Sequence, residues 1–477
     1  MSGGWRLRVE GVLLCLPAIF AWGAATGAAA QNPSKQTLDQ DYQAAVSDYN
    51  AGRLVQASDE LRRLIPYAPN SYALRELLGM VYASLGQADK AIEQLRLAVR
   101  IKPGAAEARV NLGVTLVHAG KRELAAEQFQ RASVLDPENY DAQHNLGELY
   151  VLAGKVAEAQ PCLEKAWRIH PDAYNNAYDL AMADLLLGKL DPARQIVNAL
   201  IKVRDAGELH NLLGQIDEKD HQYIAAANDY AVAAHLDPSE ENLFNWGSEM
   251  LLHRTYEPAI AIFQHGVERY PRSPRMQIGL GLADYSRGKY DQAIKALMTA
   301  ADLNPRDPRC YVFLSRAYNS SPLQADEVTQ RFRRYAQLEP RNGLAQYYYA
   351  VSLWKGRRVE DPGTNLAAVE SLLRKAIALD DSLAPAHVQL GDLYEDQRKY
   401  EASIPQYERA LQLDPGLADA YYRLGTDYVH VGRKDKAQKE FAVYQKLRAE
   451  HLAEVDKERA EVEQFVYSEK GQAPSRP

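Results

Sequence analysis

No group of residues in the sequence matches a known catalytic arrangement. There is no His-Glu-x-x-His metal motif, no Gly-x-Ser-x-Gly nucleophile motif and no phosphate-binding loop. His144 and Glu148 stand four residues apart, so on one helix they could share a metal ion, although a solvated surface pair is the simpler interpretation. Gly279-Leu280-Gly281 is better explained by helix packing than by phosphate binding. We expect no catalytic residue, no metal site and no cofactor.

Two clusters of side chains could instead form binding surfaces. Tyr347, Tyr348 and Trp354 could make an aromatic platform for a peptide or a sugar, and packing against a neighbouring loop is the alternative. Six arginines nearby could meet an acidic partner or lipid headgroups, or could form a solvated face: Arg331, Arg333, Arg334, Arg341, Arg357 and Arg358.

A repeated unit fills most of the chain and must position these residues. Between Ser71 and Pro171, three kinds of residue recur at 34-residue steps. They are the pairs Leu78-Gly79, Leu112-Gly113 and Leu146-Gly147, the alanines Ala91, Ala125 and Ala159, and the prolines Pro103, Pro137 and Pro171. A fixed period of this length predicts a stacked array of units and not a single globular core.

Each unit has the pattern of two helices joined by a tight turn. Apolar residues such as Leu74, Leu78 and Tyr82 recur at helical spacing, and Gly86 suits the left-handed conformation that ends the first helix. The second helix ends before a proline, because the residue preceding proline is pushed out of the helical conformation. Small residues are expected where the two helices cross, since a larger side chain would hold the backbones apart: Gly79, Gly113, Gly147, Gly214, Gly247, Gly281, Gly391, Gly425, Ala91, Ala125 and Ala159.

The pattern also predicts how the chain is divided. A final charged helix should cover the apolar end of the array, because terminal repeats need a polar outer face. The segments are a signal peptide at 1–30, a linker at 31–37, regular units 1–8 at 38–307, irregular units 9–10 at 308–383 with an inserted loop at 356–365, units 11–12 at 384–451, a capping helix at 452–467 and a disordered tail at 468–477.

The first 30 residues have the features of an export signal. Arg6 and Arg8 form a short basic region, an uncharged apolar stretch follows, and Ala28-Ala29-Ala30 offers the small residues that signal peptidase requires. An uncleaved anchor is the alternative, although Pro17 weakens it. Of three cysteines, Cys15 leaves with the signal. Export without a disulfide framework favours a periplasmic or secreted location of the Gram-negative bacterial type, with no stable membrane insertion after cleavage.

Composition limits the classes of partner. The net charge is -7 over 477 residues, which argues against nucleic acid as a main partner. Tyrosine is frequent, at 29 residues against 8 phenylalanines, and a ring with a wet hydroxyl suits helices that are only half buried.

With these residues the chain closely resembles the tetratricopeptide repeat (TPR) family. Unit two carries nearly the whole family pattern, in Leu78, Gly79, Tyr82, Gly86, Ala91, Leu95, Ala98 and Pro103. The resemblance covers about residues 38–451 and implies an all-α fold, a right-handed α-solenoid of about twelve helix-turn-helix repeats. It also implies that the first helices line a concave groove, which holds a peptide or a partner protein.

On that resemblance, Asn111, Asn145 and Asn245 stand on the groove side just before the Leu-Gly or Trp-Gly pair. They are similar to an asparagine ladder that grips a peptide backbone, because a side-chain amide offers both a donor and an acceptor. A solvated helix face is the alternative, and three residues interrupt the ladder: Asp179, Gly279 and Gln389. The basic clamp of chaperone-binding members is not found.

The predicted function is a non-catalytic scaffold that binds a peptide or partner protein. Envelope assembly, secretion and polysaccharide export are roles suggested by family analogy. One alternative is a carbohydrate-binding or enzymatic α-solenoid, which would need clustered carboxylates with shifted pKa values in the groove. The other is an obligate subunit of an envelope complex.

Overall fold

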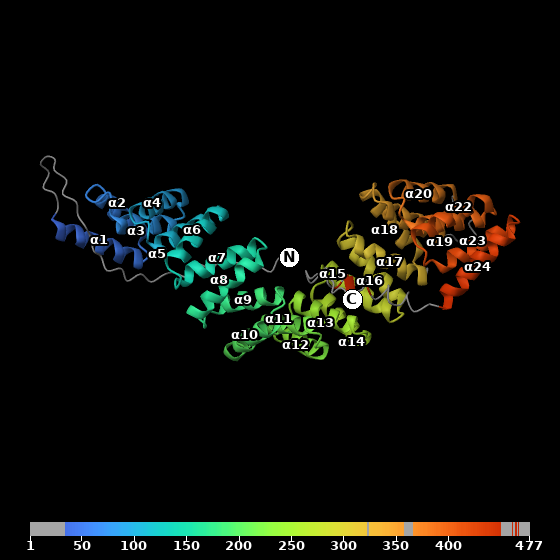
Figure 1. Ribbon diagram of the computed structural model, residues 1–477, viewed down its shortest axis with the longest axis horizontal. Coiled ribbons are helices and arrows are strands. Elements are labelled where there is room, and N and C mark those ends of the chain that lie inside the picture. Colours follow the sequence, from blue (N-terminus) through green and yellow to red (C-terminus); the bar gives the residue numbers. More distant parts are fainter. Residues whose placement is uncertain are drawn as a thin grey trace. The chain divides into compact units, whose positions relative to one another are not determined.

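The computed structural model describes residues 34–321, 324–356 and 366–449, together with residues 460, 463, 464 and 466. These residues form 24 helices and, within the described ranges, no strand (Figure 1). The chain divides into two compact units after His221. The predicted all-α class, built from consecutive helix pairs, is confirmed.

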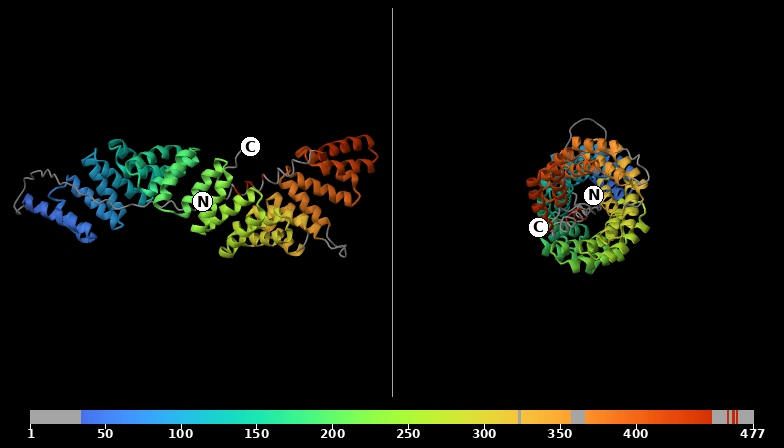
Figure 2. Two further views of the ribbon diagram at one scale, coloured as in Figure 1. Left: turned by 90° about the horizontal axis from the view of Figure 1, so that it is seen from below. Right: turned by 90° about the vertical axis from the view of Figure 1, so that its right-hand side faces the viewer.

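The first unit holds the helices up to α11, stacked side by side in chain order (Figures 1 and 2). They are α1 (Lys35–Asn50), α2 (Leu54–Leu64), α3 (Tyr72–Ser84), α4 (Ala88–Ile101), α5 (Ala106–His118), α6 (Arg122–Leu135), α7 (Tyr140–Leu152), α8 (Val156–Ile169), α9 (Tyr174–Leu186), α10 (Leu190–Val203) and α11 (Gly207–Lys219).

The second unit begins with α12 and continues the same alternation. Its helices are α12 (Tyr223–Leu236), α13 (Glu240–Leu252), α14 (Tyr256–Arg269), α15 (Pro274–Ser286), α16 (Tyr290–Leu303), α17 (Pro308–Ser320), α18 (Ala325–Leu338), α19 (Gly343–Lys355), α20 (Leu366–Leu379), α21 (Ala384–Asp396), α22 (Tyr400–Leu413), α23 (Ala418–His430) and α24 (Lys434–Ala449).

Glycine turns and prolines end the helices where the sequence predicts. Gly86 has a φ of 72°, and the N–H of Gln87 donates to the Tyr82 carbonyl at 2.9 Å, which satisfies a carbonyl at the end of α3. Lys102, which precedes Pro103, leaves the helical region with φ -129° and ψ 82°. The same left-handed turn is made by arginine at Arg254 and Arg398, with φ values of 58° and 57°.

The two helices of a pair approach closely at the small residues. A Cβ at Gly79 would lie 2.6 Å from Leu95 Cγ, and one at Gly147 would lie 2.7 Å from Leu163 Cδ2. Such distances leave no room for a side chain. In each case the partner stands 16 residues later, on the second helix, and the further pairs are Gly113 with Phe129, Gly247 with Phe263, Gly281 with Leu297, Gly391 with Tyr407 and Gly425 with Phe441.

The odd-numbered helices form an inner layer in each unit. Successive odd helices contact one another from α1 to α9 and from α13 to α19, whereas among the described even helices only α16 and α18 approach to a similar extent. Helices that are closer together lie on the inside of a stack that curves. Side chains on α5, α7 and α9 therefore face neighbours on the inner layer.

Several predicted segments lie outside the described residues. These are the signal peptide, residues 31–33 of the predicted linker, nearly all of the loop at 356–365 and the tail at 468–477. The linker was predicted to reach residue 37, but α1 already begins at Lys35. Of the expected capping helix at 452–467, the structure describes four residues, and one of them, Val466, belongs to the buried cluster built from α12 to α19 rather than to the cluster of α22–α24. Within the described ranges, no helix is both long and apolar enough to cross a membrane.

The close crossing at Gly147 predicts that one substitution there changes stability in opposite directions in two backgrounds. Gly147→Ala should lower the free energy of unfolding by about 1–3 kcal/mol, because the new methyl group would overlap Leu163. In a Leu163→Ala background the same change should raise it by up to 1 kcal/mol, roughly the helix-propensity difference, because the space is then free. Urea unfolding followed by circular dichroism measures both. The same destabilisation in both backgrounds would contradict the packing explanation.

The left-handed turns predict a second effect on stability. Arg398→Gly should raise the free energy of unfolding by about 0.5–1 kcal/mol, because glycine adopts a φ of 57° without strain. Gly432 occupies the equivalent turn 34 residues later, and no atom lies within 4 Å of a Cβ placed there. Gly432→Ala should therefore lower stability through backbone strain alone. If Arg398→Gly is neutral or destabilising in thermal unfolding, the turn is not strained.

Candidate functional site

Polar side chains follow the inner layer of the first unit at one fixed register. Asn111, Asn145 and Asp179 stand at 34-residue steps on α5, α7 and α9. Glu148 lies one turn beyond Asn145 on α7. We name these four residues the polar row. Because the register is preserved from pair to pair, each member has a neighbour on the adjacent odd helix.

The two asparagines of the polar row are tied into the helices in different ways. Asn111 is half-buried, and its Nδ2 donates to Glu76 Oε1 on α3 at 3.3 Å. Glu76 is fully buried, and burial raises the pKa of its carboxyl group. Asn145 is buried, and its Nδ2 donates to the Asp141 carbonyl of its own helix at 2.7 Å. Asn111 therefore contacts the neighbouring odd helix α3, whereas Asn145 bonds within its own helix.

Glu148 and Asp179 form the most strongly perturbed part of the row. Glu148 is 4% exposed and Asp179 is 9% exposed. Burial raises the pKa of Glu148 to about 7 and that of Asp179 to about 8, with the negative charge of Glu148 contributing to the second shift. Desolvation is the first cause of both shifts.

The protonation state changes what Asp179 offers to a ligand. Near pH 7 the pair retains at least one proton, because two adjacent buried carboxylates resist a double charge. A protonated carboxyl group has one donor and one acceptor, as a side-chain amide has. A protonated Asp179 would therefore offer the same kinds of group as Asn111 and Asn145. The sequence analysis did not anticipate the burial of Asp179 beside Glu148.

His144 and Glu148, which the sequence suggested as a possible metal-binding pair, have different surroundings in the structure. His144 Nδ1 lies 3.1 Å from Asn176 Oδ1, and its ring stacks on Tyr140 with centroids 5.4 Å apart. Glu148 is buried and not solvated, because its position on α7 faces α9. In the part of the chain that the structure describes, no group of three His, Cys, Asp or Glu side chains is placed to hold a metal ion.

The second unit has no equivalent row among its described residues. Asn245 on α13 is buried, and at the next register Gly279 lies against Phe263, where a Cβ would be 2.7 Å from its Cζ. Gln389 Nε2 donates to Asp392 Oδ2 at 3.2 Å. Asn245 therefore has no amide neighbour at the following position.

The aromatic residues of α19 serve mainly as core. Tyr348 and Trp354 are each 9% exposed, and the Tyr348 ring lies 5.6 Å from that of Phe332. Tyr347 is half-buried and Trp354 packs with Val369. This burial favours packing over the ligand platform, because the rings fill space between α18, α19 and α20.

The nearby arginines are partly neutralised. Arg331 and Arg334 both bond to Asp302, at 2.6 Å and 2.8 Å. Arg333 and Arg341 are exposed, and Arg357 and Arg358 lie outside the described residues.

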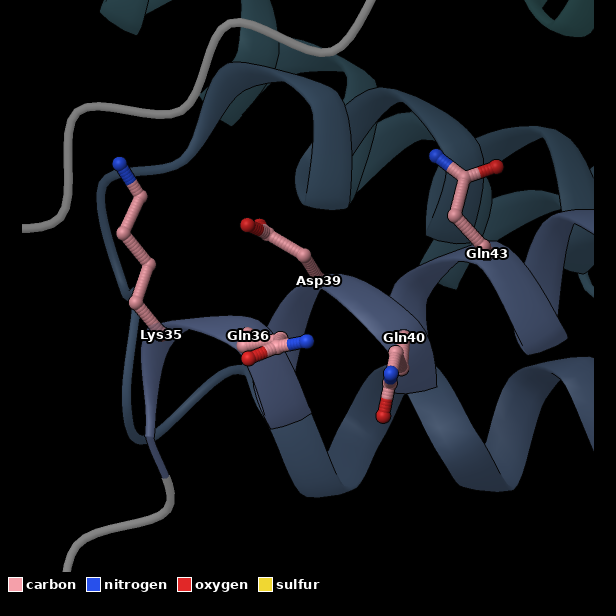
Figure 3. A pocket seen from close by; sticks show the side chains of 5 residues that line it. All are labelled: Lys35, Gln36, Asp39, Gln40 and Gln43. Atoms are coloured by element: carbon pink, nitrogen blue, oxygen red, sulfur yellow. The ribbon is translucent and has the colours of Figure 1, made fainter.

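Each unit has a hollow on the surface of its described residues. One is over α1, where Figure 3 shows Lys35, Asp39 and Gln43 projecting from one face of the helix. All its lining residues come from that single helix, so it is too open to hold a ligand in place. The other, in the second unit, is lined mainly by residues of α13, α15 and α17 and measures about 440 Å³.

The unfavourable burial of the Glu148–Asp179 pair predicts how stability depends on pH. Both pKa values are raised above the unfolded values of about 3.9 and 4.3. The folded state therefore binds more protons, and its stability falls as the pH rises from about 4 through 8. Asp179→Asn should reduce the loss of unfolding free energy between pH 5 and pH 9 by at least 1 kcal/mol, roughly the value of one pKa unit.

Urea unfolding at a series of pH values measures this dependence. Asp172→Asn, an exposed aspartate before α9, is the matched control and should leave the profile unchanged. An identical profile for wild type and Asp179→Asn would show that Asp179 titrates normally.

Comparison with known proteins finds repeat families along both units. Models described as tetratricopeptide repeat match residues 42–106, 110–174, 151–216, 253–308 and 278–330, and one described as TPR repeat matches 391–429. Human protein O-mannosyl-transferase TMTC1 is 26% identical over 211 residues, which are 44% of this chain and 22% of that protein. The match thus covers about a fifth of the length of the human protein.

Solved structures with similar helices have low overall agreement. The Naa15/Naa10 complex bound to HypK-THB is 14% identical with a TM-score of 0.39, over 85% of this chain and 68% of that one. A structure from the characterisation of Pseudomonas aeruginosa pilF is 22% identical with a TM-score of 0.37, over 43% and 95% of the two chains. A tetratricopeptide repeat protein from Parabacteroides merdae ATCC 43184 is 19% identical with a TM-score of 0.36, over 52% and 99%.

Proposed function

Because the chain belongs to the tetratricopeptide repeat family, we propose that it is a non-catalytic scaffold that holds a peptide or partner protein against the inner layer of its helices. The observation that carries this proposal is the pair of largely buried carboxyl groups, Glu148 and Asp179, whose pKa values burial raises and which lie at the register of the polar row. A polypeptide backbone lying along the polar row would supply donors and acceptors to these groups.

The spacing of the polar row suits an extended chain of any sequence. Asn111, Asn145 and protonated Asp179 each offer a donor and an acceptor, and so does each peptide unit of a ligand. Such contacts depend little on the side chains of the partner. Affinity should therefore fall above about pH 8, when Asp179 loses its proton and only accepts.

The setting that we propose is the bacterial cell envelope. The basic start, apolar stretch and small residues of the first 30 positions support export to the periplasm or beyond. A scaffold for envelope assembly, secretion or polysaccharide export fits that location, as does an obligate subunit of an envelope complex. Each of these roles uses the inner layer as a protein-binding face.

An enzymatic or carbohydrate-binding solenoid is the second candidate, and the same pair favours it. Two carboxyl groups with pKa values near neutrality can serve as general acid and base. The human relative is named an O-mannosyl-transferase, although the match spans 22% of that protein. The two candidates differ in what an amide at position 179 would do: it preserves a donor and an acceptor for a backbone but cannot transfer a proton.

Crosslinking capture from the native envelope distinguishes the candidates. The combined variant Asn111→Ala, Asn145→Ala and Asn245→Ala should lose the captured protein at least ten-fold. Asn198→Ala, an exposed asparagine on α10 in the outer layer, is the matched control and should retain it.

Asp179→Asn provides the decisive comparison in the same assay. This variant should still capture the partner, and its binding should no longer weaken above pH 8. If the triple variant captures the same protein as wild type, neither the asparagines of the polar row nor Asn245 bind the partner. If Asp179→Asn abolishes turnover of a glycan while binding persists, the enzymatic candidate is correct.

A further inference from the structure

The hollow of the second unit combines positive charge with aromatic walls. It measures about 440 Å³, within the range of roughly 300–1,000 Å³ that small-molecule sites have. It lies at the turns that follow α13 and α15, beside α17. Six of its lining residues, which we name the Arg–Tyr hollow, are Arg254, Arg287, Arg316, Tyr256, Tyr285 and Tyr290.

Positive charge exceeds negative charge at the Arg–Tyr hollow. Its lining carries three arginines and one carboxylate, that of Glu463. Glu257, outside the lining, pairs with Arg287 at 2.8 Å and with Lys289 at 3.1 Å. Arg254 is exposed, and among the described residues its guanidinium group has neither an ion pair nor a hydrogen bond. Arg254 is therefore the group best placed to receive an anion.

The backbone at Arg254 has a conformation that favours glycine. Its φ is 58°, whereas Gly86 and Gly432 make the equivalent turn with φ values of 72° and 79°. The left-handed conformation costs free energy in any residue that has a Cβ. Folding alone would favour glycine at this turn, and a ligand that needs the guanidinium group gives a reason for arginine. Arg398, at the same turn after α21, does not line the hollow and serves as a comparison.

The tyrosines supply the second half of the site. Tyr285 and Tyr290 are half-buried, and their ring centroids lie 5.6 Å apart with the rings inclined at 56°. A tyrosine presents an apolar ring face and, at its edge, a hydroxyl group that both donates and accepts. This combination suits a ligand that has apolar C–H groups on one face and hydroxyl groups around its rim.

We propose that the Arg–Tyr hollow binds an acidic sugar, with the carboxylate on Arg254 and the pyranose ring against the tyrosines. Hydrogen bonds between a guanidinium group and a carboxylate are charge-assisted and stronger than those between neutral groups. The ring places C–H groups against the aromatic faces and hydroxyl groups near the tyrosine hydroxyls. The site lies wholly in the second unit and goes beyond the scaffold role, because it rests on neither the polar row nor the Glu148–Asp179 pair.

A ligand-observed NMR titration of the chain with glucuronate, glucose and acetate tests this chemistry. Glucuronate and glucose differ only at C6, where one has a carboxylate and the other a hydroxymethyl group, and acetate is a carboxylate without a ring. Glucuronate should bind at least ten-fold more tightly than either. Equal binding of glucose overturns the role of the arginines, and equal binding of acetate overturns that of the tyrosines. No binding of glucuronate overturns the proposal.

A pair of glycine variants separates binding from folding. Arg254→Gly should raise the midpoint of thermal unfolding and weaken glucuronate binding at least ten-fold, because glycine relieves the turn but removes the guanidinium group. Arg398→Gly is the matched control, which should raise the midpoint and leave binding unchanged. Unchanged binding in Arg254→Gly, or the same loss in both variants, overturns the assignment of Arg254 as the anion-binding group.

Removing the negative charge of the lining tests the sign of the ligand. Glu463→Gln should strengthen glucuronate binding at least two-fold, because a like charge no longer faces the carboxylate. Unchanged or weaker binding overturns recognition by charge. Sugar binding and capture of a protein by the asparagine variants are separate measurements, so failure of one proposal leaves the other standing.

Discussion

The architecture depends on the close crossing of two helices at residues without side chains. In pair after pair, a glycine on the first helix lies against a large residue 16 positions later on the second, as Gly147 does against Leu163 and Gly281 against Leu297. The contact fixes the separation and rotation of the two helices. Successive odd helices contact one another from α1 to α9 and from α13 to α19. The polar row is a consequence, since residues 34 positions apart fall on neighbouring helices of one layer.

This register places groups where their electrostatic cost is high. Glu148 and Asp179 are removed from water by neighbouring helices, and their raised pKa values reflect that loss of hydration. A fold selected for stability alone would have apolar residues at these positions. The cost is understandable if a partner completes the hydrogen bonds.

The local features of the fold were predictable because they depend on few residues. A left-handed turn at Gly86 and a helix end before Pro103 follow from backbone sterics alone. Burial was harder to predict, because it depends on neighbours in the next repeat. The sequence suggested that Glu148 is solvated, whereas it is buried on α7 beside Asp179 of α9. Likewise, the sequence does not show that Tyr348 and Trp354 are enclosed by α18 and α20, or that Val466 lies beside helices about 150 positions earlier.

The most direct test of the central claim is site-specific photo-crosslinking to the bound partner. Asn175 is exposed on α9, one turn before Asp179 and on the same face, whereas Asn198 is exposed on α10 in the outer layer. A photo-reactive amino acid at each position reports which layer the partner touches. A partner protein crosslinked from position 175 and not from position 198 is the predicted result. Crosslinking from position 198 alone would show that the partner binds the outer layer, and the polar row would then have no role in recognition.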